Sequence, residues 1–119
     1  MALMEELAAR VFAARNAAHR AHWKTGSFSA HMALGEFYDQ VIDDVDSIVE
    51  TYQGRFGLLA DFTVTDPAPA NIVAYLTVEV EWIEANRNAI SGGSTAVENL
   101  LDSLIGTYRH TLYKLVNLA

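Results

Sequence analysis

The sequence contains no cysteine, so disulfide bonds and thiolate metal sites are excluded. Basic residues are also few, because 8 Lys and Arg stand against 15 Asp and Glu and the formal net charge is −7 at pH 7. Nucleic-acid affinity comes largely from Lys and Arg that neutralise phosphates, so we do not expect the chain to bind DNA. Neither a Gly-rich phosphate loop nor a convincing Ser/His/Asp arrangement is present.

Long apolar runs are missing as well. The N-terminal stretch MALMEELAARVFAARNAAHRAHW is interrupted by Glu5, Glu6, Arg10 and Arg15, and it lacks the continuous apolar core of a signal peptide or membrane span. We therefore expect a soluble, cytoplasmic protein without membrane association. With 119 residues and 51% hydrophobic composition, the chain is long enough for one core, which predicts a single domain over residues 1–119.

Apolar residues recur at helical spacing in several segments. Residues 3–24 form an Ala-rich helical pattern, and a second pattern runs to Gly54 after TGSFS, whose Gly and Ser can end one helix and cap the next. The last pattern begins at Thr95, which forms a predicted capping box with Glu98, and it runs almost to the C-terminus. The apolar stripes of these three segments are Met4, Leu7, Val11 and Ala18; Leu34, Phe37, Val41, Val45, Ile48 and Tyr52; and Val97, Leu100, Leu104, Tyr108, Leu112 and Leu115.

The segment between these patterns is less regular. Residues 55–70 contain both prolines and predict a partly packed connection with at most a short helix. In YLTVEVEWI the apolar residues alternate as in a strand, although Leu76, Val80 and Ile83 also fit a helix. No turn signal occurs between Asn71 and the SGG at 91–93, and this interval is too long for an ordinary strand, which favours a helix. Four helices with a longer connection between the second and third predict an all-α, ferritin-like four-helix bundle.

Asp46 and Glu50 are candidate metal ligands on the second predicted helix. They lie four residues apart, so both side chains emerge from one face and can hold one divalent cation. The alternative is that they belong to a solvated acidic face together with neighbouring aspartates.

His31 lies 15 residues before Asp46 on roughly the same stripe of that helix. At ~1.5 Å per residue the two are about 22 Å apart, so one chain cannot bring them together. Two copies of the helix packed antiparallel about a two-fold axis near residues 39 and 40 would place His31 of each against Asp46 and Glu50 of the other. His22, just before the connection, could complete each site, although it could equally be a partly buried helix-end histidine. Such a mixed N/O set suits Fe(II), Zn(II) or Mn(II).

The pattern of these residues, with AHW at 21–23 followed by Gly26, Phe28 and His31 and then by the acidic pair, resembles the signature of Dps, the mini-ferritins of starved bacteria. The family's ferroxidase sites lie at a dimer two-fold, with two histidines from one subunit and an aspartate and a glutamate from the other. The resemblance implies that His22, His31, Asp46 and Glu50 are the catalytic and metal-binding residues, that iron is the metal, and that the assembly is a dodecamer. The larger ferritins fit less well, because the sequence contains no Glu-x-x-His.

The chain also departs from the Dps pattern. The stretch between His22 and His31 is three residues shorter than the usual Dps spacing, so His19, one turn before His22, is a substitute or additional ligand. A Lys-rich N-terminal arm is missing. In its short length, and in AHMALGEFYDQ and VETYQGRFG, the sequence is similar to the compact Dps-like proteins of tailed phages.

Two functions are therefore expected from the sequence. The first is a Dps-type ferroxidase that oxidises Fe(II) with peroxide or oxygen and stores ferric iron in a hollow oligomer. Trp23, beside His22, is most simply a packing residue, and it could alternatively intercept oxidising equivalents. The second is a non-catalytic structural or interaction protein with at most a structural metal site, such as a virion-associated phage component.

Overall fold

Four helices and no strand make up the chain. The computed structural model describes residues 1–119, and the helices are α1 (Leu3–Lys24), α2 (Phe28–Phe56), α3 (Ile72–Ser91) and α4 (Thr95–Asn117). The predicted all-α class is confirmed, and the strand interpretation of YLTVEVEWI is wrong. None of the helices combines the length and the apolar character that a bilayer span requires.

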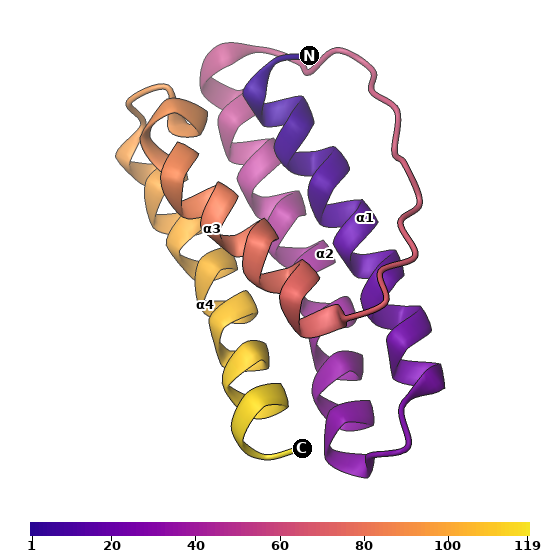
Figure 1. The fold of residues 1–119 in the computed structure, drawn as a ribbon. Coiled ribbons are helices and arrows are strands. Elements are labelled where there is room, and N and C mark those ends of the chain that lie inside the picture. The colour runs from indigo at the N-terminus through magenta and orange to yellow at the C-terminus, as the bar shows by residue number, and fades with distance from the viewer.

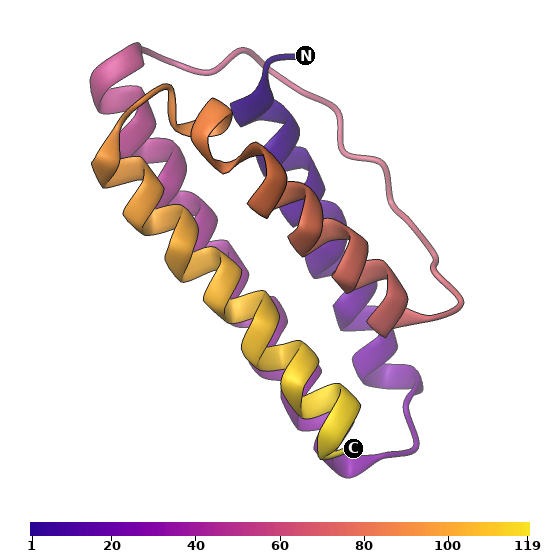
Figure 2. The same cartoon turned by 60° about the vertical axis from the view of Figure 1, so that its left-hand side comes forward.

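The helices pack so that each touches two neighbours. α1 contacts α2 and α3, and α4 contacts the same two helices. Short connections make α1–α2 and α3–α4 antiparallel hairpins (Figure 1). Residues 57–71 instead pass alongside α1 to the opposite end of the molecule before α3 begins (Figure 2). α3 consequently runs parallel to α2.

Apolar side chains from all four helices form one core. The predicted stripes point into it, although Leu101 is fully buried in α4 whereas Leu100 is only partly buried. In α3, Leu76 and Val80 are buried while Val78 between them is 60% exposed, as expected for a helix and not for a strand. The largest fully buried side chains are Met4, Leu7, Val11, Leu34, Phe37, Ile48, Leu76, Ile83, Ile90, Leu101, Leu104 and Tyr108.

The connection of residues 57–71 contains no helix, in agreement with the sequence. Its first part is held by two side-chain oxygens of the helices. The amide Oε1 of Gln53 accepts from the backbone N–H of Leu59 at 2.9 Å, and the carboxylate Oε1 of Glu5 accepts from that of Ala60 at 3.0 Å. Further along, Arg20 forms an ion pair with Asp66 at 2.8 Å and also donates to the carbonyl of Pro67. The segment is therefore attached to α1 and α2 by these polar contacts and by Leu59 and Phe62, which are partly buried against the core.

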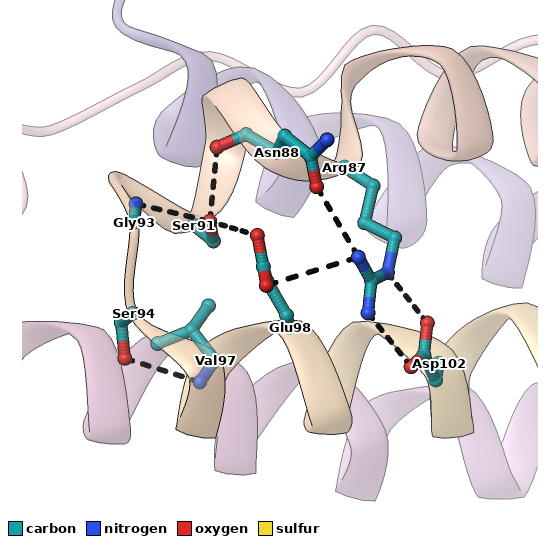
Figure 3. A network of polar contacts seen from close by, with 8 residues as sticks. All are labelled: Arg87, Asn88, Ser91, Gly93, Ser94, Val97, Glu98 and Asp102. Carbon is teal, nitrogen blue, oxygen red and sulfur yellow. Dashed lines mark hydrogen bonds and ion pairs between the residues drawn. The ribbon is translucent and has the colours of Figure 1, made fainter.

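The start of α4 differs from the predicted capping box. The N-cap is Ser94, whose hydroxyl accepts from the backbone N–H of Val97 at 3.3 Å, so Thr95 is the first helical residue (Figure 3). Glu98 instead reaches back across the turn and accepts from the Ser91 hydroxyl at 3.0 Å. Both Ser94 and Thr95 are residue types that cap helices, and the turn geometry selects the first of them.

A polar network closes the α3–α4 turn (Figure 3). Arg87 donates to both carboxylate oxygens of Asp102, at 2.6 and 2.9 Å, and lies 3.8 Å from Glu98. Ser91 is fully buried and also accepts from the backbone N–H of Gly93. Gly92 ends α3 at a φ of 59°, a left-handed conformation that glycine adopts without strain. These contacts hold the second hairpin in register.

A second polar contact ties α1 to α3. Arg10 Nη1 lies 3.2 and 3.0 Å from the two carboxylate oxygens of the buried Glu79, and Arg10 Nε donates to Glu6 at 3.1 Å. The guanidinium also lies 4.2 Å from the ring centroid of Trp82. A buried carboxylate without this partner would be costly, so Arg10 is what allows Glu79 to face the interior.

Two tyrosines lie near this ion pair. Tyr108 is completely buried, packs edge-to-face on Phe37 at 4.9 Å, and has a hydroxyl without a hydrogen-bond partner in the chain. Burial raises the pKa of Tyr108 well above its usual value, and the charge of Glu79 adds to the effect. Burial and then Glu79 raise the pKa of Tyr75 to about 12.

We predict that Tyr108→Phe does not destabilise the protein. The substitution removes a buried hydroxyl that makes no hydrogen bond, so the free energy of unfolding in urea should stay within ~0.5 kcal/mol or increase. Tyr108→Ala is the matched control, and it should lower the free energy by about 3–5 kcal/mol through a cavity. A loss above ~1 kcal/mol for Tyr108→Phe would show that the hydroxyl has a partner after all.

We also predict a decline of stability at alkaline pH. The folded state raises the pKa of both tyrosines, so the unfolded chain loses these protons first, near pH ~10. Their contribution is complete below that pH and is lost as the pH rises through about 12, the pKa of Tyr75. Urea unfolding from about pH 8 to 11 should show a shallower decline for the Tyr75→Phe, Tyr108→Phe double variant than for the wild type, and equal slopes would contradict the assignment.

Candidate metal centre

The α1–α2 corner brings His22 and His31 into direct contact. His22 lies in the last turn of α1 and His31 in the first turns of α2, and Ser27 caps α2 by accepting from the backbone N–H of Ala30. The two imidazole rings stack with centroids 3.6 Å apart and an interplanar angle of 16°. The shortened connection therefore does not keep His22 away from His31.

Two reciprocal hydrogen bonds fix this pair. Nδ1 of His22 donates to the backbone carbonyl of His31 at 2.6 Å, and Nδ1 of His31 donates to the carbonyl of His22 at 2.8 Å. A carbonyl oxygen only accepts, so both Nδ1 atoms must carry a proton. In a neutral imidazole the lone pair then resides on Nε2, and this nitrogen makes no hydrogen bond within the chain in either ring.

This arrangement is what metal-binding histidines usually require. The ring nitrogen that does not bind the metal commonly donates to a carbonyl or carboxylate, which fixes the tautomer and the ring orientation. Here each ring receives that support from the backbone of the other histidine. The single chain thus presents two imidazoles in the tautomer that binds metal through Nε2.

Gly35 provides the space for the His22 ring. A Cβ atom at this position would lie 3.2 Å from Cε1 and 3.3 Å from Nδ1 of His22, closer than side chains normally approach. Nδ1 is the atom that donates to His31, so the missing side chain lets α2 approach the hydrogen-bonded edge of the ring. This role of Gly35 was not predicted from the sequence, in which the only signal for it is a glycine inside a helix, where alanine would be more favourable by ~1 kcal/mol.

His19 does not join the histidine pair. Its ring stacks on Tyr38 at 4.0 Å and 13°, and its centroid is 6.1 Å from that of His22. Burial lowers the pKa of His19, and the positive charge of Arg15 lowers it further. The ring centroid of Trp23 lies 4.3 Å from that of His19, but Trp23 is 69% exposed, so it packs on His19 at the surface and not in the core.

Asp46 and Glu50 are exposed on α2 and form no hydrogen bond or ion pair through their side chains. The continuous α2 helix separates His31 from Asp46 by ~22 Å and from Glu50 by ~28 Å, as helical rise requires. No group of three or more His, Asp or Glu side chains in this chain is arranged to hold a metal ion. A single chain therefore offers the imidazole pair at one end of α2 and free carboxylates toward the other.

Comparison with known proteins identifies one family. A model described as a family of unknown function (DUF5856) matches residues 22–115. The chain belongs to this family. The DUF5856 segment begins at His22 and includes His31, Asp46 and Glu50, whereas His19 lies outside it. No curated protein and no solved structure matches the chain.

We predict that Gly35→Ala disrupts the histidine pair. The new methyl group would press on Nδ1 of His22, so the His22 to His31 carbonyl bond should lengthen or break. Imidazole ¹⁵N NMR should then show loss of the fixed Nδ1–H tautomer, while the His31 ring loses its stacked partner.

The matched control is Gly54→Ala, because Gly54 lies in the same helix with nothing within 4 Å of an added Cβ. It should stabilise the protein by up to ~1 kcal/mol without changing the histidine spectra. Unchanged tautomers in both variants would contradict the role assigned to Gly35.

Proposed function

We propose that this protein is a Dps-type ferroxidase that binds Fe(II) between two subunits and oxidises it with peroxide or oxygen. The observation that carries the proposal is the reciprocal His22–His31 pair, in which both rings keep a free Nε2 lone pair. The architecture agrees with it, because ferritin-like folds are four-helix bundles with one long crossover connection, and residues 57–71 form one long connection here.

Antiparallel pairing of two α2 helices would complete the site. His22 and His31 of one subunit would supply nitrogen ligands, and Asp46 and Glu50 of the partner subunit would supply oxygen ligands. All four residues are at least partly exposed, and the two carboxylates have no competing partner in their own chain. The donor set fits Fe(II), with Zn(II) or Mn(II) as the other metals that such a site accepts.

The chemistry follows from these ligands. Fe(II) enters as the substrate, attracted by a chain with a net charge of −7. The imidazoles and carboxylates hold the iron while each ion gives up one electron, and two electrons with two protons reduce one peroxide molecule to two waters. The carboxylates also suit the ferric product, which is a harder cation than Fe(II). The resemblance to Dps further implies a hollow shell of twelve subunits in which ferric iron is stored.

A second function is favoured by a different observation. Large apolar side chains are exposed at the end of the molecule that carries the α1–α2 corner and the C-terminus: Trp23 is 69%, Phe28 77% and Leu118 55% exposed. Exposed apolar clusters commonly mark protein interfaces. A structural or interaction protein, such as a virion-associated component, would use this surface and need the metal only for structure.

The test of the ferroxidase is Fe(II) oxidation by metal-stripped protein, followed by ultraviolet absorbance with oxygen or peroxide. We expect a rate clearly above that of the buffer, and a loss of at least ~10-fold in the Asp46→Ala, Glu50→Ala double variant. Glu81→Ala is the matched control, because Glu81 is an exposed carboxylate on α3 without an ion-pair partner, and it should leave the rate unchanged. If wild type and double variant fold but are equally inert, the ferroxidase proposal fails and the structural function remains.

A further inference from the structure

One face of α2 carries a row of carboxylates that the chain leaves without partners. Asp39, Asp43, Asp46 and Glu50 are exposed and form no ion pair or side-chain hydrogen bond. Their spacing of four, three and four residues places them on a single stripe of the helix. The neighbouring acidic residues differ, since Glu36 pairs with Lys114 at 2.8 Å and Asp44 accepts from the Thr107 hydroxyl at 2.6 Å. The stripe is therefore a free anionic surface.

The same face carries one cation that also has no carboxylate partner. The guanidinium of Arg15 lies 5.2 Å from the ring centroid of Tyr38, and its only side-chain hydrogen bond is to Asn16. Tyr38 directly precedes Asp39 in α2, so Arg15 lies beside the N-terminal end of the acidic stripe. The histidine pair lies at the α2 N-terminal end of the same side. The histidine pair and Arg15 thus lie toward the N-terminal end of α2, and the acidic stripe follows them toward its C-terminal end.

A second copy of this chain is the occupant that fits this surface. In the antiparallel arrangement, Arg15 of one copy would approach Asp39 and Asp43 of the partner subunit near the two-fold axis. At each end, the histidine pair would face Asp46 and Glu50 of the partner subunit. The two acidic stripes would nevertheless lie close together, and two arginines cannot neutralise eight carboxylates. Like charges at such close range oppose association.

We infer that binding of a divalent metal controls the pairing of two copies through α2, so that the chain assembles when the metal is present and dissociates when it is removed. This inference rests on the shared site proposed above and adds its regulation. A ligand that binds only the paired state strengthens pairing by mass action. With free metal at ~100 times its Kd, each site strengthens pairing about 100-fold, and two sites strengthen it about 10⁴-fold.

The experiment measures the mass of the full-length, metal-stripped protein by sedimentation velocity and native mass spectrometry over a range of concentrations. Mn(II) and Zn(II) are the probes, because they fit the donor set but do not start iron turnover. We expect monomers in EDTA and an even-numbered assembly with one filled site per subunit after metal addition. Mg(II) at the same ionic strength is the control for charge screening, and it should have much less effect because it prefers oxygen ligands.

Three variants test whether metal controls the pairing. His31→Ala and the Asp46→Ala, Glu50→Ala double variant should each lose the response to Mn(II) and Zn(II). A mixture of the two should recover it in part, because a mixed pair contains one site with both histidines and both carboxylates. Asp39→Asn with Asp43→Asn should act in the opposite direction and allow pairing in EDTA, since it removes the central repulsion while keeping the metal ligands.

The outcomes separate the two proposals. If the protein pairs equally well in EDTA and in metal, and the mixture still restores metal binding, metal control is wrong and the shared site stands. If metal binds monomers without pairing them, or if the mixture restores nothing, the shared site fails, and with it both proposals.

Discussion

The unbroken α2 helix is the constraint on which the other features of this protein depend. Its apolar residues pack against α1 and α4, and its length of 29 residues fixes where every polar group on its remaining surface lies. His31 near one end and Glu50 near the other cannot approach each other without breaking the helix. Any centre that uses both must therefore involve a second molecule.

The nitrogen and oxygen donors are prepared in different ways. The imidazoles of His22 and His31 are oriented by backbone carbonyls, which move little as long as the α1–α2 corner is intact. Gly35 contributes because it has no side chain, which leaves space in α2 for the His22 ring. The carboxylates of Asp46 and Glu50 are exposed and have no hydrogen bond or ion pair that would orient them. The pre-formed half of the proposed site is the half that would select for transition metals over calcium or magnesium.

The helices could be predicted from the sequence because periodic burial and capping residues are local signals. The bounds of α1 were predicted correctly, and Asn71 and SGG marked the ends of α3. The N-cap of α4 was missed by one residue, since Ser94 and Thr95 are adjacent capping types and the choice depends on Ser91 and Glu98 across the turn. Local patterns do not contain that information.

In the candidate site, too, some features could be predicted from local sequence spacing and others depend on the three-dimensional arrangement. Helical spacing was enough to place Asp46 and Glu50 on one face and to separate them from His31. The reciprocal hydrogen bonds of the histidines could not be predicted, because they depend on how the backbone turns between residues 24 and 28. The same geometry determines that His19 stacks on Tyr38 instead of joining the pair.

The long connection between α2 and α3 has a consequence for how the chain can be divided. The only covalent link between the α1–α2 and α3–α4 hairpins is residues 57–71, which lie on the outside of the molecule (Figure 2). A protease that cuts there would separate the covalent chain into two intact hairpins, each with one side of the common core. The N-terminal fragment, with α1 and α2, would retain every proposed ligand. The C-terminal fragment, with α3 and α4, would bind to it non-covalently and bury its apolar face.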